Sequence, residues 1–259
     1  MDLGIQGRTA LVCGASAGLG KAIARALVVE RVNVTLVART QATLEAARAE
    51  LSELGAGTVA IVAADVTTEE GREAALQACA NPDILVNNAA GPPVGHFRKL
   101  TRDDWIKALD GNMLSAIDLI NATLDHMIEQ RFGRILNITS HMVKAPSAPL
   151  SLSNGARAGL TGYVGGIARE FAEHNVTINN LLPGQFDTDR LRSNHTRFAE
   201  MRGMDLAAAQ DSFRKQVPVK RFGRPEEMGA FAAFLCSTHA GFMTGQNLML
   251  DGGQYPGLF

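Results

Sequence analysis

Cys13-Gly14-Ala15-Ser16-Ala17-Gly18-Leu19-Gly20 follows an apolar run and precedes a stretch of helical character. Gly14 permits a tight turn after a strand, Gly18 lets the backbone approach a pyrophosphate, and Gly20 allows close packing of the next helix. That helix presents free N–H groups and positive potential at its N-terminus. Glycines alone can mark a tight turn, but strand, turn and helix together near the N-terminus predict a dinucleotide-binding site.

The same alternation of strand and helix continues through the chain. Runs rich in Val, Ile and Leu, most of them too uniformly apolar to have a solvent-facing side, alternate with Ala-rich stretches. We expect strands at Thr9 to Cys13, Asn33 to Ala38, Val59 to Ala63, Ile84 to Val86, Arg134 to Thr139, Thr177 to Leu182 and Asn247 to Leu250. We expect helices at Lys21 to Glu30, Ala42 to Leu54, Glu69 to Ala80, Trp105 to Gln130, Ala156 to His174 and Pro225 to Cys236. This β-α-β order predicts a Rossmann-like, doubly wound sheet of about seven mainly parallel strands with helices on both faces.

Length and composition favour a single α/β domain over residues 1–259. The chain is 46% hydrophobic and 20% charged, and it contains no internal repeat, low-complexity tract or Pro/Gly-rich linker that would mark a second domain. One long insertion, from Phe186 to Val217, precedes the last helix. A segment at this place is expected to form a lid over a substrate cleft.

Charge and cysteine content exclude several classes of function. A formal net charge of -1 provides no basic field for nucleic acid and no polybasic patch for a lipid surface, so neither partner is expected. Residues Met1 to Arg8 lack a long apolar segment and predict neither a secretory signal nor a membrane span, which favours the cytoplasm. Cys13, Cys79 and Cys236 are odd in number and predict reduced, buried thiols. No His or carboxylate spacing indicates a metal site.

Further motifs follow the Gly-rich turn in a fixed order: Asn87-Asn88-Ala89-Ala90-Gly91, Asn112, Ser140, Pro183-Gly184 and Asp251-Gly252-Gly253. Together they resemble the short-chain dehydrogenase/reductase family over nearly the whole chain, most closely its branch of 3-oxoacyl-carrier-protein reductase-like enzymes. The resemblance implies hydride exchange between a nicotinamide cofactor and a carbonyl or alcohol. It also implies cofactor contacts from Gly14, Ser16, Gly18, Leu19, Gly20, Asp65, Val66, Asn88, Ala89, Pro183, Gly184 and Thr188.

The resemblance assigns two catalytic roles by position. In the family, a Ser orients the substrate oxygen and an Asn supports a water that links the site to solvent, and these roles fall on Ser140 and Asn112. A Tyr protonates the oxygen, and a Lys lowers the pKa of that Tyr and binds the ribose. Here Ser153-Asn154-Gly155-Ala156-Arg157 stands where the family has Tyr-x-x-x-Lys.

The two replacements keep binding chemistry better than proton chemistry. An aliphatic hydroxyl is far less acidic than a phenol, so Ser153 is a poor general acid, and Arg157 will not relay a proton. Ser153 could still donate a hydrogen bond to a developing alkoxide, while Arg157 could hold the ribose and supply positive potential.

Substitute proton donors lie in nearby loops. His141 and Lys144 follow the candidate catalytic Ser, and His96 lies in the loop after the fourth strand. The alternative is that these are exposed loop residues without a catalytic role. Neither Tyr restores the pattern: Tyr163 falls on roughly the opposite side of its helix from the Arg, and Tyr255 would have to enter the cleft of a neighbouring subunit.

Cofactor choice depends on the end of the second strand, where NAD-binding relatives place a carboxylate and this chain has Arg39. A planar cation there favours the 2'-phosphate of NADP(H), although a solvated surface Arg would look the same in sequence. The lid is also cationic. Its basic side chains could attract an anionic carboxylate, phosphopantetheine or CoA group, or they could form an ordinary solvated helix. They are Arg190, Arg192, Arg197 and Arg202, with His195, against Asp189 and Glu200.

Three functional hypotheses follow. The first is an NADP-dependent oxidoreductase that acts on a small carbonyl or alcohol, with a 3-oxoacyl compound as one candidate substrate, through an altered centre of Asn112, Ser140, Ser153 and Arg157. The second is a non-catalytic NADP(H)-binding sensor or partner subunit. The third is a non-redox lyase or isomerase on the same scaffold. The segment from Met243 to Gly253 resembles the interface strand of the family, which implies a homotetramer or homodimer.

Overall fold

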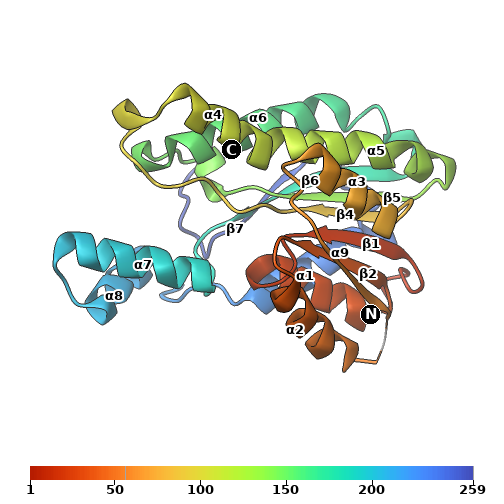
Figure 1. Ribbon diagram of the computed structural model, residues 1–259, viewed down its shortest axis with the longest axis horizontal. Helices are drawn as coiled ribbons and strands as arrows, with labels where there is room; N and C mark the ends of the chain where they lie inside the picture. Colours follow the sequence, from red (N-terminus) through yellow and green to blue (C-terminus); the bar gives the residue numbers. More distant parts are fainter. Residues whose placement is uncertain (56, 259) are drawn as a thin grey trace.

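One parallel sheet forms the centre of the computed structural model of the chain (Figure 1). The structure describes residues 1–55 and 57–258, so Ala56 and Phe259 of the expected domain lie outside the described residues. The sheet has seven strands in the order β3-β2-β1-β4-β5-β6-β7. They are β1 (Thr9–Cys13), β2 (Asn33–Ala38), β3 (Val59–Ala63), β4 (Ile84–Asn87), β5 (Gly133–Ile138), β6 (Val176–Pro183) and β7 (Asn247–Leu250). Parallel pairing of every neighbouring pair confirms the expected doubly wound sheet.

Helices cover both faces of the sheet. One buried cluster joins the sheet to α1 (Gly18–Val29), α2 (Gln41–Ser52) and α9 (Pro225–Cys236). A second cluster, on the other face, joins it to α3 (Glu69–Ala78), α5 (Ser115–Glu129) and α6 (Ser151–Ile167), as Figure 1 shows. The strand order reverses between β1 and β4: the chain runs outward from β1 to β3 and then returns to place β4 beside β1. Such a switch point is where open α/β sheets bind ligands.

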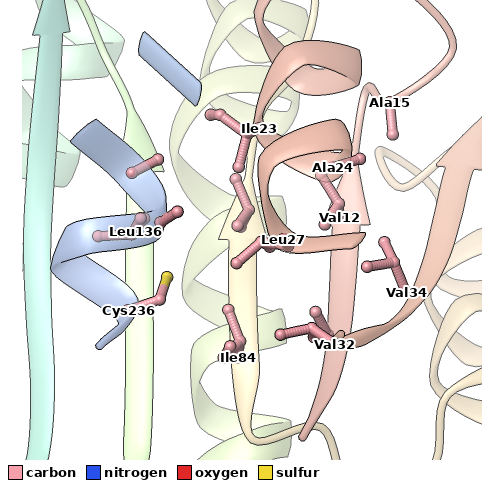
Figure 2. Close-up of a cluster of buried hydrophobic side chains, with 14 of the residues drawn as sticks. Val12, Ala15, Ile23, Ala24, Leu27, Val32, Val34, Ile84, Leu136 and Cys236 are labelled. Atoms are coloured by element: carbon pink, nitrogen blue, oxygen red, sulfur yellow. The ribbon is translucent and has the colours of Figure 1, made fainter. Parts of the chain in front are cut away.

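Helix α1 packs directly behind the predicted phosphate-binding turn. Figure 2 shows Ile23, Ala24 and Leu27 of this helix beside Val12 of β1 and Ile84 of β4. All five side chains are fully buried. Burying a Leu or Ile side chain contributes about 1.5–3 kcal/mol, so this contact fixes the position of the N-terminus of α1 against the sheet.

The helix expected from Trp105 to Gln130 runs without a break from Arg102 to Glu129, so the prediction is wrong in its start, and the helix contains a π turn that was not expected. Helix α4 (Arg102–Leu109) begins earlier because Thr101 Oγ1 accepts from Asp104 N at 3.2 Å while the Asp104 carboxylate accepts from Thr101 N at 2.9 Å. A π-helical turn, Asp110–Leu114, then joins α4 to α5. Such turns widen the helix and often occur at functional sites. This one carries Asn112.

Helix α6 also differs from the expectation of a helix over Ala156 to His174. It begins at Ser151 and ends at Ile167, and a short 3-10 turn, Ala172–His174, precedes β6. The helix therefore includes Ser153 in its first turn and Arg157 farther along the same element. Both replaced family positions are thus on one rigid helix.

The insertion after β6 forms a two-helix arm that projects from the side of the molecule (Figure 1). It consists of α7 (Asp189–Arg202) and α8 (Leu206–Gln216), joined at Gly203, whose φ of 61° ends α7 in the left-handed conformation. His195 is buried in the arm and stacks on Phe213 with ring centroids 4.4 Å apart. No helix among residues 1–55 and 57–258 is long and apolar enough to span a membrane.

Four Asn side chains form a ladder across the second half of the sheet. Asn87 Nδ2 donates to Asn137 Oδ1 at 2.9 Å, Asn137 Nδ2 donates to Asn180 Oδ1 at 3.1 Å, and Asn180 Nδ2 donates to Asn247 Oδ1 at 2.9 Å. The four residues are in register on β4, β5, β6 and β7. Each amide satisfies the next inside the sheet, which makes this buried polar row compatible with the apolar core.

Candidate active site

A cleft with a volume of about 940 Å³ lies at the carboxyl ends of the strands. It is lined by residues from the ends of the first six strands, by the first turn of α7 and by parts of α4 and α6. The structure brings into this cleft the four residues of the altered centre and every expected cofactor contact except Gly20. Those lining it are Gly14, Ser16, Gly18, Leu19, Arg39, Asp65, Val66, Asn88, Ala89, Asn112, Ser140, Ser153, Arg157, Pro183, Gly184 and Thr188.

The Gly-rich turn has the geometry of a phosphate cradle. Gly14 has a φ of 59°, and a Cβ there would lie 2.6 Å from Asn88 Nδ2. A Cβ on Gly20 would lie 2.2 Å from the carbonyl oxygen of Gly14, so this glycine allows the helix to pack against the turn instead of lining the cleft. Gly18 is the first residue of α1 and faces Thr188 across the cleft. The free N–H groups of the helix therefore point into open space where an anion fits.

The far end of the cleft, beside β2 and β3, carries an unpaired cation. Arg39 is exposed, lines the cleft, and forms no ion pair with any residue in the described part of the chain. Asp65 also lines the cleft, and its Oδ1 accepts hydrogen bonds from the backbone and hydroxyl of Thr67 at 3.0 and 2.9 Å. Arg39 is thus free to meet a phosphate group.

Ser140 and Ser153 both line the other end of the cleft. Ser140 Oγ accepts a hydrogen bond from Met142 N at 3.1 Å, so its hydroxyl proton is free to be donated into the cleft. Ser153 is half-buried and forms no hydrogen bond within the described residues. Two hydroxyl groups are therefore available to a ligand oxygen at this end.

Asn112 lies beside a small internal cavity of about 20 Å³ that Arg157 also lines. The Oδ1 atoms of Asn112 and Asn87 are buried there without a hydrogen-bond partner among the described residues. A cavity of this size and polarity is suited to one water molecule. The unpaired end of the Asn ladder thus opens beside the candidate catalytic residues.

Arg157 is buried and held at the end of β5. Its Nη1 donates to the carbonyl oxygens of Ile138 and Thr139, the latter at 2.8 Å, and the side chain is only 9% exposed. Burial, together with the positive charge of Arg190, lowers the pKa of this guanidinium to about 10. A guanidinium with that pKa is still charged at neutral pH.

Arg190, in the first turn of α7, reaches across the cleft. Its Nη2 donates to the carbonyl oxygen of Gly91, in the loop after β4, at 2.9 Å. Arg192, two residues later, is instead paired with Asp187 and Asp189 at 3.0 and 3.1 Å. Only the beginning of the arm therefore borders the cleft, and its cations differ in what they contact.

The candidate proton donors differ in whether they line the cleft. His141 lines the cleft, and its Nδ1 lies 3.0 Å from the carbonyl oxygen of Pro183. Because a carbonyl only accepts, this contact places the hydrogen on Nδ1 and leaves Nε2 for a ligand. Lys144 and His96 do not line the cleft; His96 accepts from Arg98 N instead. Tyr163 donates to Asn121 at 2.9 Å, away from the cleft.

Sequence reasoning missed Asp104 and Lys107, which also line the cleft. Both belong to α4, and the helix register that points them inward is set by the Thr101 cap and the π turn, which the apolar pattern did not reveal. The described residues contain no cluster of three or more potential metal ligands.

Comparisons with known proteins match this chain over nearly its whole length. A family model described as enoyl-(acyl carrier protein) reductase matches residues 14–254. The 3-oxoacyl-(acyl-carrier-protein) reductase FabG of Vibrio cholerae is 34% identical over 98% of this chain and 99% of its own length. The NADPH-dependent reductase BacG of Bacillus subtilis is 31% identical, with coverage of 95% and 97%. The alignments thus extend over the fold and the cleft alike.

A solved structure gives the same picture in three dimensions. The L-sorbose reductase of Gluconobacter frateurii, complexed with NADPH and L-sorbose, superimposes with a TM-score of 0.94 and is 29% identical, with both chains covered completely. The fold of this chain is therefore similar to that of a solved reductase over the length of both chains.

Proposed function

Because the chain belongs to the short-chain dehydrogenase/reductase family, we propose that it is an NADP(H)-dependent oxidoreductase that interconverts a carbonyl and an alcohol. The observation that carries this proposal is that one cleft contains the Gly-rich turn, the unpaired Arg39 and the hydroxyl of Ser140. NADP(H) is supported by that cation and by relatives that are NADPH-dependent or hold NADPH. A substrate of 3-oxoacyl type is supported by the name of the Vibrio cholerae relative.

The cofactor residues fit a dinucleotide laid along the strand ends. The N-terminus of α1 would hold the pyrophosphate, with Gly14 and Gly18 allowing close approach, and Arg39 would hold the 2'-phosphate. Asp65 and Val66 would border the adenine, and Asn88 and Ala89 would line the middle of the cofactor. The nicotinamide carboxamide would be contacted by Pro183, Gly184 and Thr188. Ser16 and Leu19 lie in the same turn. When bound, the nicotinamide supplies the hydride that adds to the carbonyl carbon.

The residues of this chain would then bind the substrate oxygen and supply the proton that it receives. Ser140 would donate its hydroxyl hydrogen to the substrate oxygen, and Ser153 would add a second hydrogen bond as negative charge develops there. We propose His141 as the proton donor: Nδ1–H is held by the Pro183 carbonyl, and the protonated ring would carry on Nε2 the second hydrogen that passes to the substrate oxygen. One hydride on carbon and one proton on oxygen convert the ketone to the alcohol. Asn112 would hold the water that reconnects this system to solvent.

A second function is favoured by one observation, the presence of Ser153 and Arg157 in place of a phenol and an amine. A protein that binds NADP(H) without turnover, as a sensor or partner subunit, would need the cradle but not the acid. Such a protein would bind NADPH tightly and leave it unoxidised in the presence of carbonyl compounds.

The test is oxidation of NADPH, followed by its absorbance, across a panel of ketones, 3-oxoacyl thioesters and 3-oxo acids. Wild type is compared with Ser153→Tyr/Arg157→Lys, with circular dichroism as the folding control. Turnover by wild type supports the reductase. Turnover by the double variant alone, with a silent but NADPH-binding wild type, overturns it in favour of the binding protein. Product formed without loss of NADPH absorbance would indicate a lyase or isomerase.

We also propose that residues 186–217 act as a lid and that the protein is a cytoplasmic homo-oligomer. Asp189, Arg190 and Leu191 of the arm line the cleft, so movement of α7 would open or close it. Phe242, beside the last strand, is fully exposed, which is a feature of interfaces. The three thiols are free and buried, which suits a reducing compartment. Light scattering measures the assembly.

A further inference from the structure

Two guanidinium groups from different elements converge on one point of the cleft. A Cβ placed on Gly91 would lie 3.1 Å from Nη2 of Arg190 and 3.5 Å from Nη2 of Arg157. The two Nη2 atoms are therefore close enough for the two oxygens of one carboxylate to contact both. Arg157 comes from α6 and Arg190 from α7, so the convergence is produced by the tertiary fold.

Neither guanidinium has an acidic partner. In the described part of the chain, Arg192 of the same arm pairs with Asp187 and Asp189, but Arg157 and Arg190 form no ion pair. Arg157 is nine-tenths buried, and its Nη2 forms no hydrogen bond within residues 1–55 and 57–258. A buried cation is costly without a compensating anion, so Arg157, with the exposed Arg190 beside it, provides a place for an anionic ligand.

The position of the pair indicates which anion it takes. The cofactor pyrophosphate has its own site at the N-terminus of α1, opposite Thr188. Arg157 is instead fixed to the carbonyl of Thr139, the residue directly before Ser140. An anion bound by Arg157 and Arg190 would thus lie near the hydroxyl of Ser140, which would orient the substrate oxygen. One molecule could reach both places if its carboxylate is a few bonds from its carbonyl.

We infer that Arg157 and Arg190 form a carboxylate subsite, and that the substrate is a free oxo acid or hydroxy acid instead of a neutral thioester. This inference rests on the proposed function, because it specifies that the substrate of the proposed oxidoreductase carries a free carboxylate. Each guanidinium would donate from Nη2 to the carboxylate, while the carbonyl or hydroxyl oxygen lies on Ser140. The contact of Arg190 with Gly91 holds the pair in place before the ligand binds.

The test measures binding without turnover. Racemic 3-hydroxyoctanoate is titrated by calorimetry into the protein saturated with NADPH, because a reduced cofactor and an alcohol cannot react. Methyl 3-hydroxyoctanoate, which lacks the negative charge, is the matched ligand. We expect the acid to bind wild type and Arg190→Met to weaken it about ten-fold or more, with the ester bound equally weakly by both. Arg192→Met, in the same helix and paired with acids, is the control and should bind the acid as wild type does.

Two outcomes would contradict the subsite. Equal affinity of wild type for acid and ester would show that no carboxylate is recognised. A rise in the Kd of NADPH in Arg190→Met, with the ratio of acid to ester affinity unchanged, would assign the pair to the cofactor. Arg157→Lys, which keeps the charge and is checked by its unfolding curve, should retain part of the preference for the acid. Failure of the reductase proposal is separate: tight binding of the acid by a protein that never oxidises NADPH would leave the subsite intact.

Discussion

Nη1 of Arg157 donates to the carbonyl oxygen of Thr139 at 2.8 Å, which fixes a cation of α6 to the end of β5. A Lys at this place has one donor group at the end of a flexible chain, whereas the planar guanidinium can bind two carbonyls through one nitrogen and keep the other free. The replacement therefore alters the centre by adding a fixed, outward-facing donor. It does not restore a proton relay, because an Arg keeps its proton at neutral pH.

Arg39 should determine the preference for NADP(H). Arg39→Ala removes the cation that would meet the 2'-phosphate, so we expect the Kd of NADPH to rise about ten- to a hundred-fold while that of NADH stays unchanged. Fluorescence titration of both cofactors measures this. Arg48→Ala, an exposed change on α2 away from the cleft, is the matched control. An equal loss of affinity for NADPH and NADH in Arg39→Ala would show that Arg39 does not bind the 2'-phosphate.

His141 should supply the proton during ketone reduction. His141→Gln keeps a donor for the Pro183 carbonyl but removes Nε2, so kcat should fall about 10²- to 10⁴-fold with KM little changed. Steady-state oxidation of NADPH with a ketone measures both constants. His96→Gln, in a loop outside the cleft, should behave as wild type. An unchanged kcat in His141→Gln would show that another group donates the proton.

The Asn ladder should contribute to stability through its interior members. Asn137→Leu leaves Asn180 Oδ1 without a partner inside the sheet and leaves Asn87 Nδ2 only its long contact with the carbonyl oxygen of Ala116 at 3.5 Å, so we expect a loss of about 2–4 kcal/mol in the free energy of unfolding. Urea unfolding measures it. Asn247→Ala, at the exposed end of the row, should cost less than about 1 kcal/mol. Equal losses in the two variants would argue against a cooperative buried ladder.

Glu227, at the N-terminus of α9, should give a pH-dependent contribution to stability. Hydrogen bonds from Arg221, at 2.7 and 2.8 Å, and from Arg224 N lower the pKa of this carboxyl from its ordinary value of 4.5 to about 2. Because the folded-state pKa is depressed, the stabilisation is complete above pH 4.5 and is lost as pH falls toward 2.

The measurement is the difference in Tm between wild type and Glu227→Gln as a function of pH. Exposure to solvent limits the effect to about 1 kcal/mol at neutral pH, and the difference should shrink between those two values. Glu226→Gln, in the same helical turn, should show no such trend. A difference independent of pH would mean that the carboxylate is not stabilised by its charge.

The boundaries of the strands were predictable to within one residue because each apolar run ends where the backbone leaves the sheet. Thr9–Cys13 and Asn247–Leu250 agree with the expectation residue for residue. The π turn was not predictable, because Leu109, Met113 and Ile117 continue an apolar pattern through it. Its position depends on how α4 packs against α6, where the ring of Trp105 lies 2.7 Å from the place of a Cβ on Gly155.

The sequence by itself determined the doubly wound sheet, the Gly-rich turn and the absence of a Tyr and a Lys from their family positions, because these follow from local residue patterns and fixed spacing. Only the tertiary structure decided which side chains meet. Arg157 and Arg190 are separated by β6 along the chain, and their convergence at Gly91 depends on how α6 and α7 are placed by the sheet. The same holds for the Asn ladder, since parallel strands join residues that are distant in sequence through register alone.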